Sequence, residues 1–138
     1  MKILITGGLG YVGSHVATVL IQNGIETVLI DTLENSSIQV LDGIESITGK
    51  APIFRKIDAG NETQMNHLFD EFTDIGGVIH FAAYKSVNES VSQPLRYYNN
   101  NLGSLKQLLK YLIPNSIPLI FSSSCAVYGQ SESLPIRE

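Results

Sequence analysis

Three evenly spaced glycines, Gly7, Gly10 and Gly13, follow the first apolar run of the chain and precede its first helical pattern. In such a G-x-x-G-x-x-G loop, the first glycine permits a tight turn and the second lets the backbone approach a pyrophosphate. The third lets a helix pack closely on a strand. The N–H groups that start this helix then face the phosphates, assisted by the helix dipole. The spacing therefore predicts a dinucleotide-binding loop between a strand at Lys2–Thr6 and a helix at Tyr11–Gln22.

Apolar runs and helical patterns alternate along the rest of the chain. Parallel strands need crossovers of a dozen or more residues, and these crossovers cover both faces of a sheet. We therefore expect one α/β domain over residues 1–138, a doubly wound, Rossmann-like parallel sheet that is truncated after about five strands. The other expected strands are 27–30, 53–57, 77–83 and 119–123, and the other expected helices are 38–47, 62–72 (capped by Asn61) and 94–112.

The composition restricts the partners that such a domain could have. The 138 residues are 43% hydrophobic and 16% charged, with a net charge of −4, so the chain is too apolar to be disordered. It has no basic stripe, which argues against nucleic acid, and no apolar run of about 18 residues that could span a membrane. A single cysteine is typical of a reducing, cytoplasmic location. No residues have metal-site spacing, so no metal is expected.

An acidic residue stands where the dinucleotide fold needs one. Asp31 closes the second expected strand, 18 residues after Gly13. A carboxylate at this place accepts hydrogen bonds from the hydroxyls of the adenosine ribose. It also repels a 2′-phosphate, and no lysine or arginine occurs between Asp31 and Lys50 to offset that repulsion. NAD is therefore expected as the cofactor, in preference to NADP.

Longer motifs resemble one enzyme family along essentially the whole chain. The chain is similar to the N-terminal part of the UDP-glucose 4-epimerases, which are extended short-chain dehydrogenases/reductases. The resemblance implies interconversion of UDP-glucose and UDP-galactose, in which NAD transiently oxidises C4 of the hexose. It also implies a UDP-hexose substrate and, in the full-length form, a homodimer built by helix pairing. The matching segments are TGGLGYVGSH at 6–15, IHFAAYKSVNES at 79–90, PLRYYNNN at 94–101 and FSSSCAVYG at 121–129.

The resemblance implies a role for each matching residue. Ser124 corresponds to the active-site serine, whose hydroxyl would touch the 4-hydroxyl of the sugar and help position it for proton transfer. Lys85 would contact the substrate as well as the cofactor. The residues implied to bind NAD are Gly7, Gly10, Tyr11, Val12 and Gly13 at the pyrophosphate, Asp31, Thr32, Leu33, Glu34, Asn35 and Ser36 at the adenosine ribose, Asp58 and Ala59 at the adenine, and Phe81, Ala82, Ala83, Tyr84, Lys85 and Asn100 on the nicotinamide side.

The chain departs from the family pattern at one point. Family members carry a Tyr-x-x-x-Lys pair beyond the serine, in which the tyrosine transfers the proton, and residues 1–138 contain no such pair. We therefore expect the isolated chain to be inactive as an epimerase. We also expect a last strand without its next neighbour to expose Leu119, Ile120 and Phe121, which would make the isolated chain marginally stable or self-associating.

Two other functions remain open from the sequence. One is a different NAD-dependent sugar-nucleotide enzyme such as a dehydratase, against which Lys85 and the Glu89-Ser90 pair argue. The other is a non-catalytic NAD-binding module, which agrees with the missing tyrosine–lysine pair but not with the retained Ser124.

Several of these polar residues also have a simple structural explanation. His80, between two apolar neighbours, is predicted to be a hydrogen-bonded core histidine, and Tyr97 and Tyr98 are predicted to be packing residues on the long helix. Lys85 could be a solvated surface charge, and Ser124 could merely cap a turn.

Replacement of the acidic residue tests the dinucleotide hypothesis. A charge-assisted hydrogen bond contributes about 1.5–3 kcal/mol, so Asp31→Asn should weaken NAD binding by roughly 10- to 150-fold. Calorimetric titration of both proteins with NAD measures this difference, and equal affinities would refute the role of Asp31.

Overall fold

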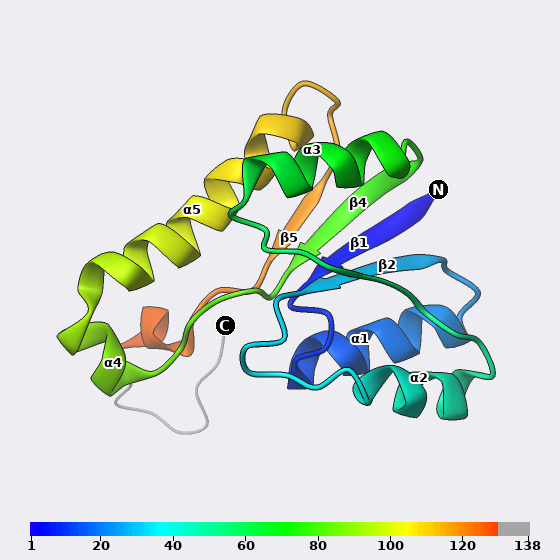
Figure 1. Cartoon of the computed structure of the whole chain (residues 1–138), viewed down its shortest axis with the longest axis horizontal. Coiled ribbons are helices and arrows are strands. Elements are labelled where there is room, and N and C mark those ends of the chain that lie inside the picture. Colours follow the sequence, from blue (N-terminus) through cyan, green and yellow to red (C-terminus); the bar gives the residue numbers. More distant parts are fainter. Residues whose placement is uncertain (130–138) are drawn as a thin grey trace.

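The strands of the predicted sheet all form, and they pair in parallel. A computed structural model describes residues 1–129 (Figure 1), so the last part of the predicted domain, 130–138, lies outside the described residues. The strand order is β3-β2-β1-β4-β5, which is the predicted doubly wound arrangement. The strands are β1 (Lys2–Thr6), β2 (Thr27–Asp31), β3 (Ile53–Lys56), β4 (Ile75–His80) and β5 (Leu119–Phe121). The helices are α1 (Tyr11–Gln22), α2 (Val40–Thr48), α3 (Glu62–Glu71), α4 (Val87–Ser92), α5 (Pro94–Leu112) and the short 3₁₀ helix η1 (Cys125–Tyr128).

Helices cover both faces of the sheet, as Figure 1 shows, with α1 and α2 on one face and α3 and α5 on the other. Alternate residues of the central strand β1 pack against the helices on opposite faces of the sheet, because successive side chains of a strand point to opposite faces. Leu4 of β1 packs in the cluster with α3 and α5, whereas Ile5 packs in the cluster with α1 and α2. No helix within residues 1–129 is long and apolar enough to cross a membrane.

The fourth strand differs from its predicted bounds of 77–83. It starts earlier, because Ile75 pairs with Lys2 across an irregularity in the register, and it ends at His80. Its neighbour β1 stops at Thr6, where the glycine loop turns away. The N–H of Ala82 consequently donates to the Thr6 hydroxyl, at 3.2 Å, instead of to a strand carbonyl. Residues 81–83 therefore leave the sheet as a loop at its carboxyl edge.

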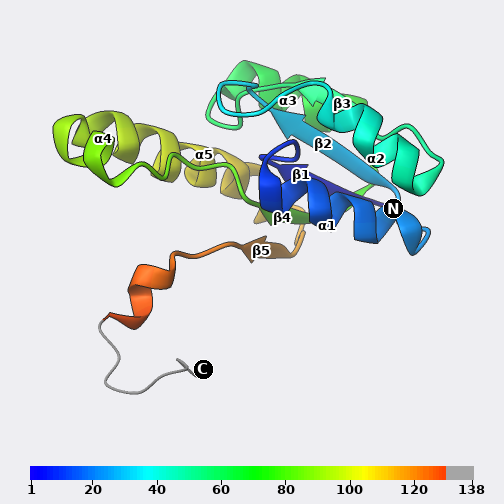
Figure 2. The same cartoon turned by 90° about the horizontal axis from the view of Figure 1, so that it is seen from below.

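The helix boundaries depend on local caps. The predicted cap Asn61 is confirmed, since its side chain accepts a hydrogen bond from the N–H of Gln64 at 3.0 Å. The short helix α4 is not among the predicted elements. Its cap is Ser86, whose hydroxyl accepts from the N–H of Glu89. Both α4 and the N-terminal part of α5 extend beyond the carboxyl edge of the sheet (Figures 1 and 2).

The last strand is only partly covered. Ile120 is 63% exposed and Phe121 50% exposed, as predicted, but Leu119 packs against the core cluster beneath α5. The expectation that all three would be exposed is therefore wrong for Leu119, because its side chain points to the face that α5 covers. Figure 2 shows the chain after β5 running away from the rest of the domain toward η1.

His80 is the core histidine that the sequence predicts. Its side chain is 2% exposed, and Nδ1 lies 2.6 Å from the Thr6 hydroxyl while Nε2 lies 3.4 Å from the Ser104 hydroxyl. The Thr6 oxygen also accepts from the N–H of Ala82, and with two lone pairs it can accept from a second donor as well. Each ring nitrogen therefore has a hydroxyl partner, and the tautomer decides which of the two donates. Burial lowers the pKa of His80 from 6.5 to about 4.

Helix α1 lies close against the glycine loop. A Cβ atom at Gly13 would lie 2.2 Å from the carbonyl oxygen of Gly7, which is backbone and cannot move aside cheaply. Gly13→Ala should therefore destabilise the fold by about 1–3 kcal/mol. Gly43→Ala is the matched control, because no atom lies within 4 Å of its Cβ position on α2, and it should stabilise by up to about 1 kcal/mol. Urea unfolding distinguishes the two, and equal losses would contradict the packing argument.

Acidification should reveal the buried histidine. The unfolded state takes up a proton at the usual pKa of 6.5, whereas folded His80 does so only at about 4. Its contribution is complete above pH 6.5 and is lost as the pH falls toward 4, by up to about 3 kcal/mol. In urea unfolding at neutral and acidic pH, His80→Asn, which can still form a hydrogen bond with Thr6, should lose less stability on acidification than the wild type. Equal losses would show that His80 does not contribute.

Candidate functional site

The glycine loop presents free main-chain donors at the carboxyl edge of the sheet. Gly7 has a φ of 64°, which favours glycine, and its carbonyl accepts from the N–H of Gly10 at 3.0 Å. Helix α1 then begins at Tyr11 without a side-chain cap and without an acidic residue in its first turn. The first N–H groups of a helix have no partner within the helix. Those of Tyr11 and Val12 can therefore hold an anion such as a pyrophosphate.

Asp31 fixes two loops with one carboxylate. Its Oδ2 accepts from the N–H of Leu9 in the glycine loop at 3.1 Å, and its Oδ1 accepts from the N–H of Leu33 and the hydroxyl of Ser36, at 3.0 and 2.8 Å. Two carboxylate oxygens can accept about four hydrogen bonds. Capacity for a ribose hydroxyl therefore remains. Leu33 adopts a φ of 65° in this turn, which nothing in the sequence pattern indicated.

A polar pocket brings together residues from two predicted parts of the site, the adenine side and the nicotinamide side. It has a volume of about 460 Å³, within the roughly 300–1,000 Å³ range of small-molecule sites. Predicted site residues Asp58, Tyr84 and Asn100 share this pocket. Ala59, also predicted to meet the adenine, is buried and packs in the core cluster with α3 and α5. The full lining is Asp58, Gly60, Tyr84, Arg96, Asn99 and Asn100.

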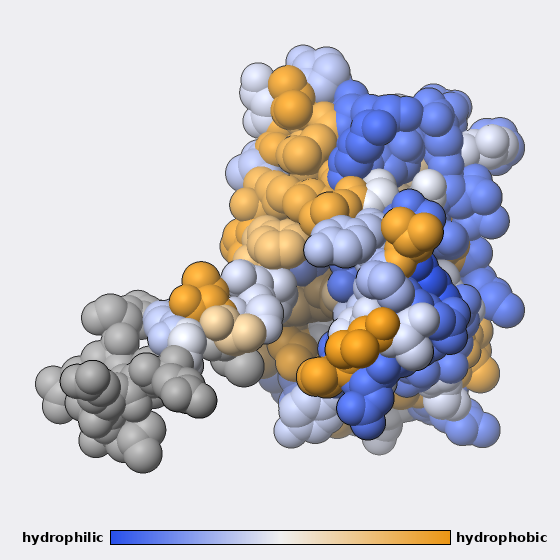
Figure 3. All heavy atoms as spheres, turned by 90° about the vertical axis from the view of Figure 1, so that its left-hand side faces the viewer, coloured by the Kyte–Doolittle hydropathy of each residue, from blue (hydrophilic) through white to orange (hydrophobic). Residues whose placement is uncertain are grey.

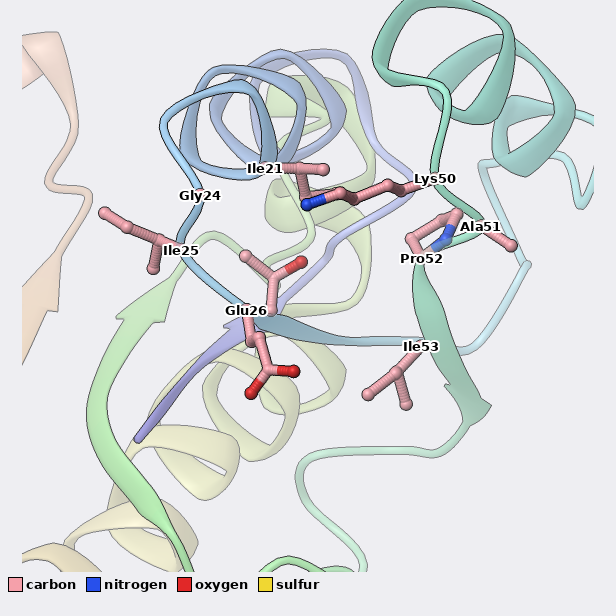
Figure 4. Close-up of a pocket in the computed structure, with 9 residues that line it drawn as sticks. Ile21, Gly24, Ile25, Glu26, Lys50, Ala51, Pro52 and Ile53 are labelled. Carbon is pink, nitrogen blue, oxygen red and sulfur yellow. The ribbon is translucent and has the colours of Figure 1, made fainter.

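A second pocket lies at the opposite edge of the sheet (Figure 4). It has a volume of about 150 Å³ and lies where β2 and β3 begin, between Glu26 and Lys50. Ligands of doubly wound sheets bind at the carboxyl ends of the strands. This pocket is therefore not part of the nucleotide site.

Helix α5 holds the loop that follows β4. The Asn101 side chain accepts from the N–H of Tyr84 at 2.8 Å and donates to the Tyr84 carbonyl at 3.0 Å. The buried Tyr97 hydroxyl accepts from the N–H of Ser86 at 3.1 Å and donates to Glu89 at 2.8 Å. Tyr97 is thus a packing residue that also positions the loop, whereas Tyr98 is exposed and the prediction that it packs is wrong. The triple Asn99-Asn100-Asn101 was the available signal for this role of α5.

The structure also brings in a cation that the sequence argument missed. No lysine or arginine follows Asp31 closely in the chain, but Arg96 of α5 lies 3.9 Å from the carboxylate of Glu34 in the predicted ribose loop. Glu34 also accepts a hydrogen bond from the hydroxyl of Tyr84 at 2.6 Å, which raises the pKa of Tyr84. A search confined to neighbours in sequence could not detect a partner 62 positions away.

The predicted nicotinamide side is less enclosed among the described residues. Ala82 lies against the glycine loop, since a Cβ atom on Gly7 would come within 2.8 Å of its nitrogen. Ala83 and Lys85 are exposed, which agrees with a solvated charge at Lys85. Ser124 is also exposed, and its hydroxyl caps η1 by accepting from the N–H of Ala126 at 3.2 Å. The catalytic role of Ser124 therefore stays a prediction. Residues 1–129 contain no cluster that could hold a metal ion.

Comparison with known proteins identifies relatives along the whole chain. A UDP-glucose 4-epimerase of Dictyostelium discoideum is 44% identical over 138 residues, which are 99% of this chain and 40% of that protein. A UDP-glucose 4-epimerase sequence of Klebsiella pneumoniae is 43% identical over 139 residues and is covered to 99% of its length. The crystal structure of the Bifidobacterium longum UDP-glucose 4-epimerase, in complex with NAD+ and UDP, superposes with a TM-score of 0.92 at 40% identity. The superposition covers 100% of this chain and 41% of the Bifidobacterium chain.

These similarities confirm the predicted fold class and the resemblance noted in the sequence. The chain spans about 40% of the length of the Dictyostelium protein and of the Bifidobacterium structure. Residues 3–138 match the pattern of the NAD-dependent epimerase/dehydratase family. The NAD dependence of this family and the NAD+ in the Bifidobacterium structure support the prediction of NAD as the cofactor. The chain belongs to the NAD-dependent epimerase/dehydratase family.

Proposed function

We propose that this chain is the NAD-binding part of a UDP-hexose 4-epimerase that interconverts UDP-glucose and UDP-galactose. One observation carries the proposal: an uncapped helix start, the carboxylate of Asp31 and a polar pocket lie at one edge of the sheet. The relatives with 40–44% identity named above are UDP-glucose 4-epimerases, which supports the choice of reaction.

Bound NAD would supply a hydride acceptor for C4 of the hexose, and the chain supplies position and charge. The N–H groups of Tyr11 and Val12 hold the pyrophosphate, and Asp31 accepts from the ribose hydroxyls. The loop at 81–85 lies along the nicotinamide side, held in place by Asn101. The carboxylate of Asp31 disfavours a 2′-phosphate, so NAD binds in preference to NADP.

Proton transfer needs a group that residues 1–138 do not provide. In this proposal Ser124 orients the 4-hydroxyl of the sugar, and Lys85 adds a positive charge near the substrate. The tyrosine that takes the proton would come from the Tyr-x-x-x-Lys pair of the family, which does not occur in residues 1–138. The chain by itself is therefore proposed to bind the cofactor without catalysing the reaction.

The proposed homodimer is supported by an apolar stripe on α4 and α5. Leu95, Tyr98 and Leu102 are exposed at helical spacing along one side of α5, and Val87 and Val91 are exposed on α4. Hydrophobic residues lie along this end of the molecule in Figure 3. Such a stripe favours helix pairing between two copies. A cytoplasmic location is proposed as well, and the single cysteine of the chain supports it.

A chimera tests the proposed reaction. The 138 residues are joined to the C-terminal part of the Dictyostelium relative, of which they match the first 40%. We expect the chimera to bind NAD and to convert UDP-galactose in a coupled assay, because it regains the tyrosine–lysine pair. The chain alone should bind NAD without turnover. A chimera that is folded and binds NAD but converts neither UDP-hexose would refute the epimerase assignment, and tighter binding of NADP than NAD would refute the cofactor assignment.

A further inference from the structure

Three side chains join two loops beside the nucleotide pocket. Glu34 belongs to the loop after β2, Tyr84 to the loop after β4, and Arg96 to the first turn of α5. The Tyr84 hydroxyl donates to the Glu34 carboxylate at 2.6 Å, and the guanidinium carbon of Arg96 lies 4.6 Å from the centre of the Tyr84 ring. Arg96 also lies 3.9 Å from Glu34, so each of the three contacts the other two. These residues are called the strap below.

The strap is anchored at the α5 end. Arg96 pairs with Glu89 of α4, and Glu89 accepts a second hydrogen bond from the Tyr97 hydroxyl. Asn101 holds the backbone of Tyr84 by two hydrogen bonds. The arginine and tyrosine of the strap are therefore fixed to the helices.

The end at Glu34 has less support. The loop at 32–36 is held at its base, where Asp31 accepts from Leu33 and Ser36. The side chain of Glu34 is half exposed and reaches across to the other loop. This contact connects the loop predicted to hold the adenosine ribose with the wall of the pocket that contains Asp58 and Asn100. Opening of the strap would separate the two.

The contacts of the strap are weak enough to break and re-form. Exposed ion pairs and hydrogen bonds contribute little each, because water competes for the same groups. An exposed contact worth up to about 1 kcal/mol changes a rate or an equilibrium by about fivefold. The strap can therefore slow the loss of a ligand without preventing its exchange.

We propose that the strap of Glu34, Tyr84 and Arg96 retains the bound dinucleotide by tying the ribose loop to the pocket wall, with Arg96 as a positioning residue that acts through Tyr84. This inference rests on the proposed binding of NAD. Arg96 was not among the predicted site residues, and its part in the strap follows from its position over the tyrosine ring.

The test measures the dissociation and association rates of NAD by stopped flow on the full chain. Tyr84→Phe removes the hydroxyl but keeps the ring under Arg96, and Glu34→Ala removes the carboxylate. Each should release NAD about fivefold faster, with a smaller change in association and a correspondingly weaker affinity. The double variant should release NAD no faster than Glu34→Ala alone, because that substitution already breaks the hydrogen bond that Tyr84→Phe removes. Arg96→Leu should also accelerate release.

Matched controls use the same chemistry away from the strap. Tyr98→Phe removes an exposed tyrosine hydroxyl from α5, and Glu45→Ala removes an exposed carboxylate from α2. Both should release NAD at the wild-type rate. Urea midpoints for all variants verify folding, and Glu34→Gln provides a milder substitution should Glu34→Ala unfold.

The outcomes separate the strap from the proposed function. Wild-type release rates in the folded strap variants, or additive effects in the double variant, would overturn the strap while NAD binding stands. If the association and dissociation rates of NAD rose equally, so that the affinity did not change, the proposal that the strap retains NAD would also be overturned. A folded wild-type chain that binds no NAD would refute the proposed function itself, and the strap with it.

Discussion

The close approach of α1 to the glycine loop is the constraint on which the site depends. With only hydrogen atoms on Gly13, the helix reaches the backbone of Gly7, where a Cβ atom would lie 2.2 Å from the carbonyl oxygen. The start of α1 is thereby held at the carboxyl edge, next to the end of β4. Asp31 binds the same loop from the side of β2, through the N–H of Leu9. The N–H groups at the start of α1 and the carboxylate of Asp31 are consequently held in fixed relation.

Side chains of α5 organise the other half of the pocket. Loops at the carboxyl edge lack strand partners, so their backbone groups need other hydrogen-bond partners. Asn101 provides these for Tyr84, and Tyr97 provides one for Ser86. The long helix therefore does more than cover the sheet. At Ser104 the helix contacts His80 in the core. At Asn101 it binds the backbone of the loop that contains Lys85.

The residues proposed to bind the dinucleotide and those proposed to meet the sugar differ in their exposure. Asp31 is hydrogen-bonded to the glycine loop and Asp58 lines the polar pocket, whereas Lys85 and Ser124 are exposed. Apolar residues of β5 and of α5, Ile120, Phe121, Leu95 and Leu102, are exposed as well. This division agrees with a chain that matches about 40% of the length of the Dictyostelium epimerase.

The sequence by itself determined the order of the five strands and of helices α1, α2, α3 and α5, the glycine loop, and the acidic residue after the second strand. These features depend on hydrophobic period, glycine spacing and caps such as Asn61, all of which act between near neighbours. Only the tertiary structure decided where β4 ends, that Leu119 is covered, and that Arg96 lies beside Glu34. Each depends on a contact between segments far apart in the chain, and such contacts follow from the packing of the sheet and α5 and not from local pattern.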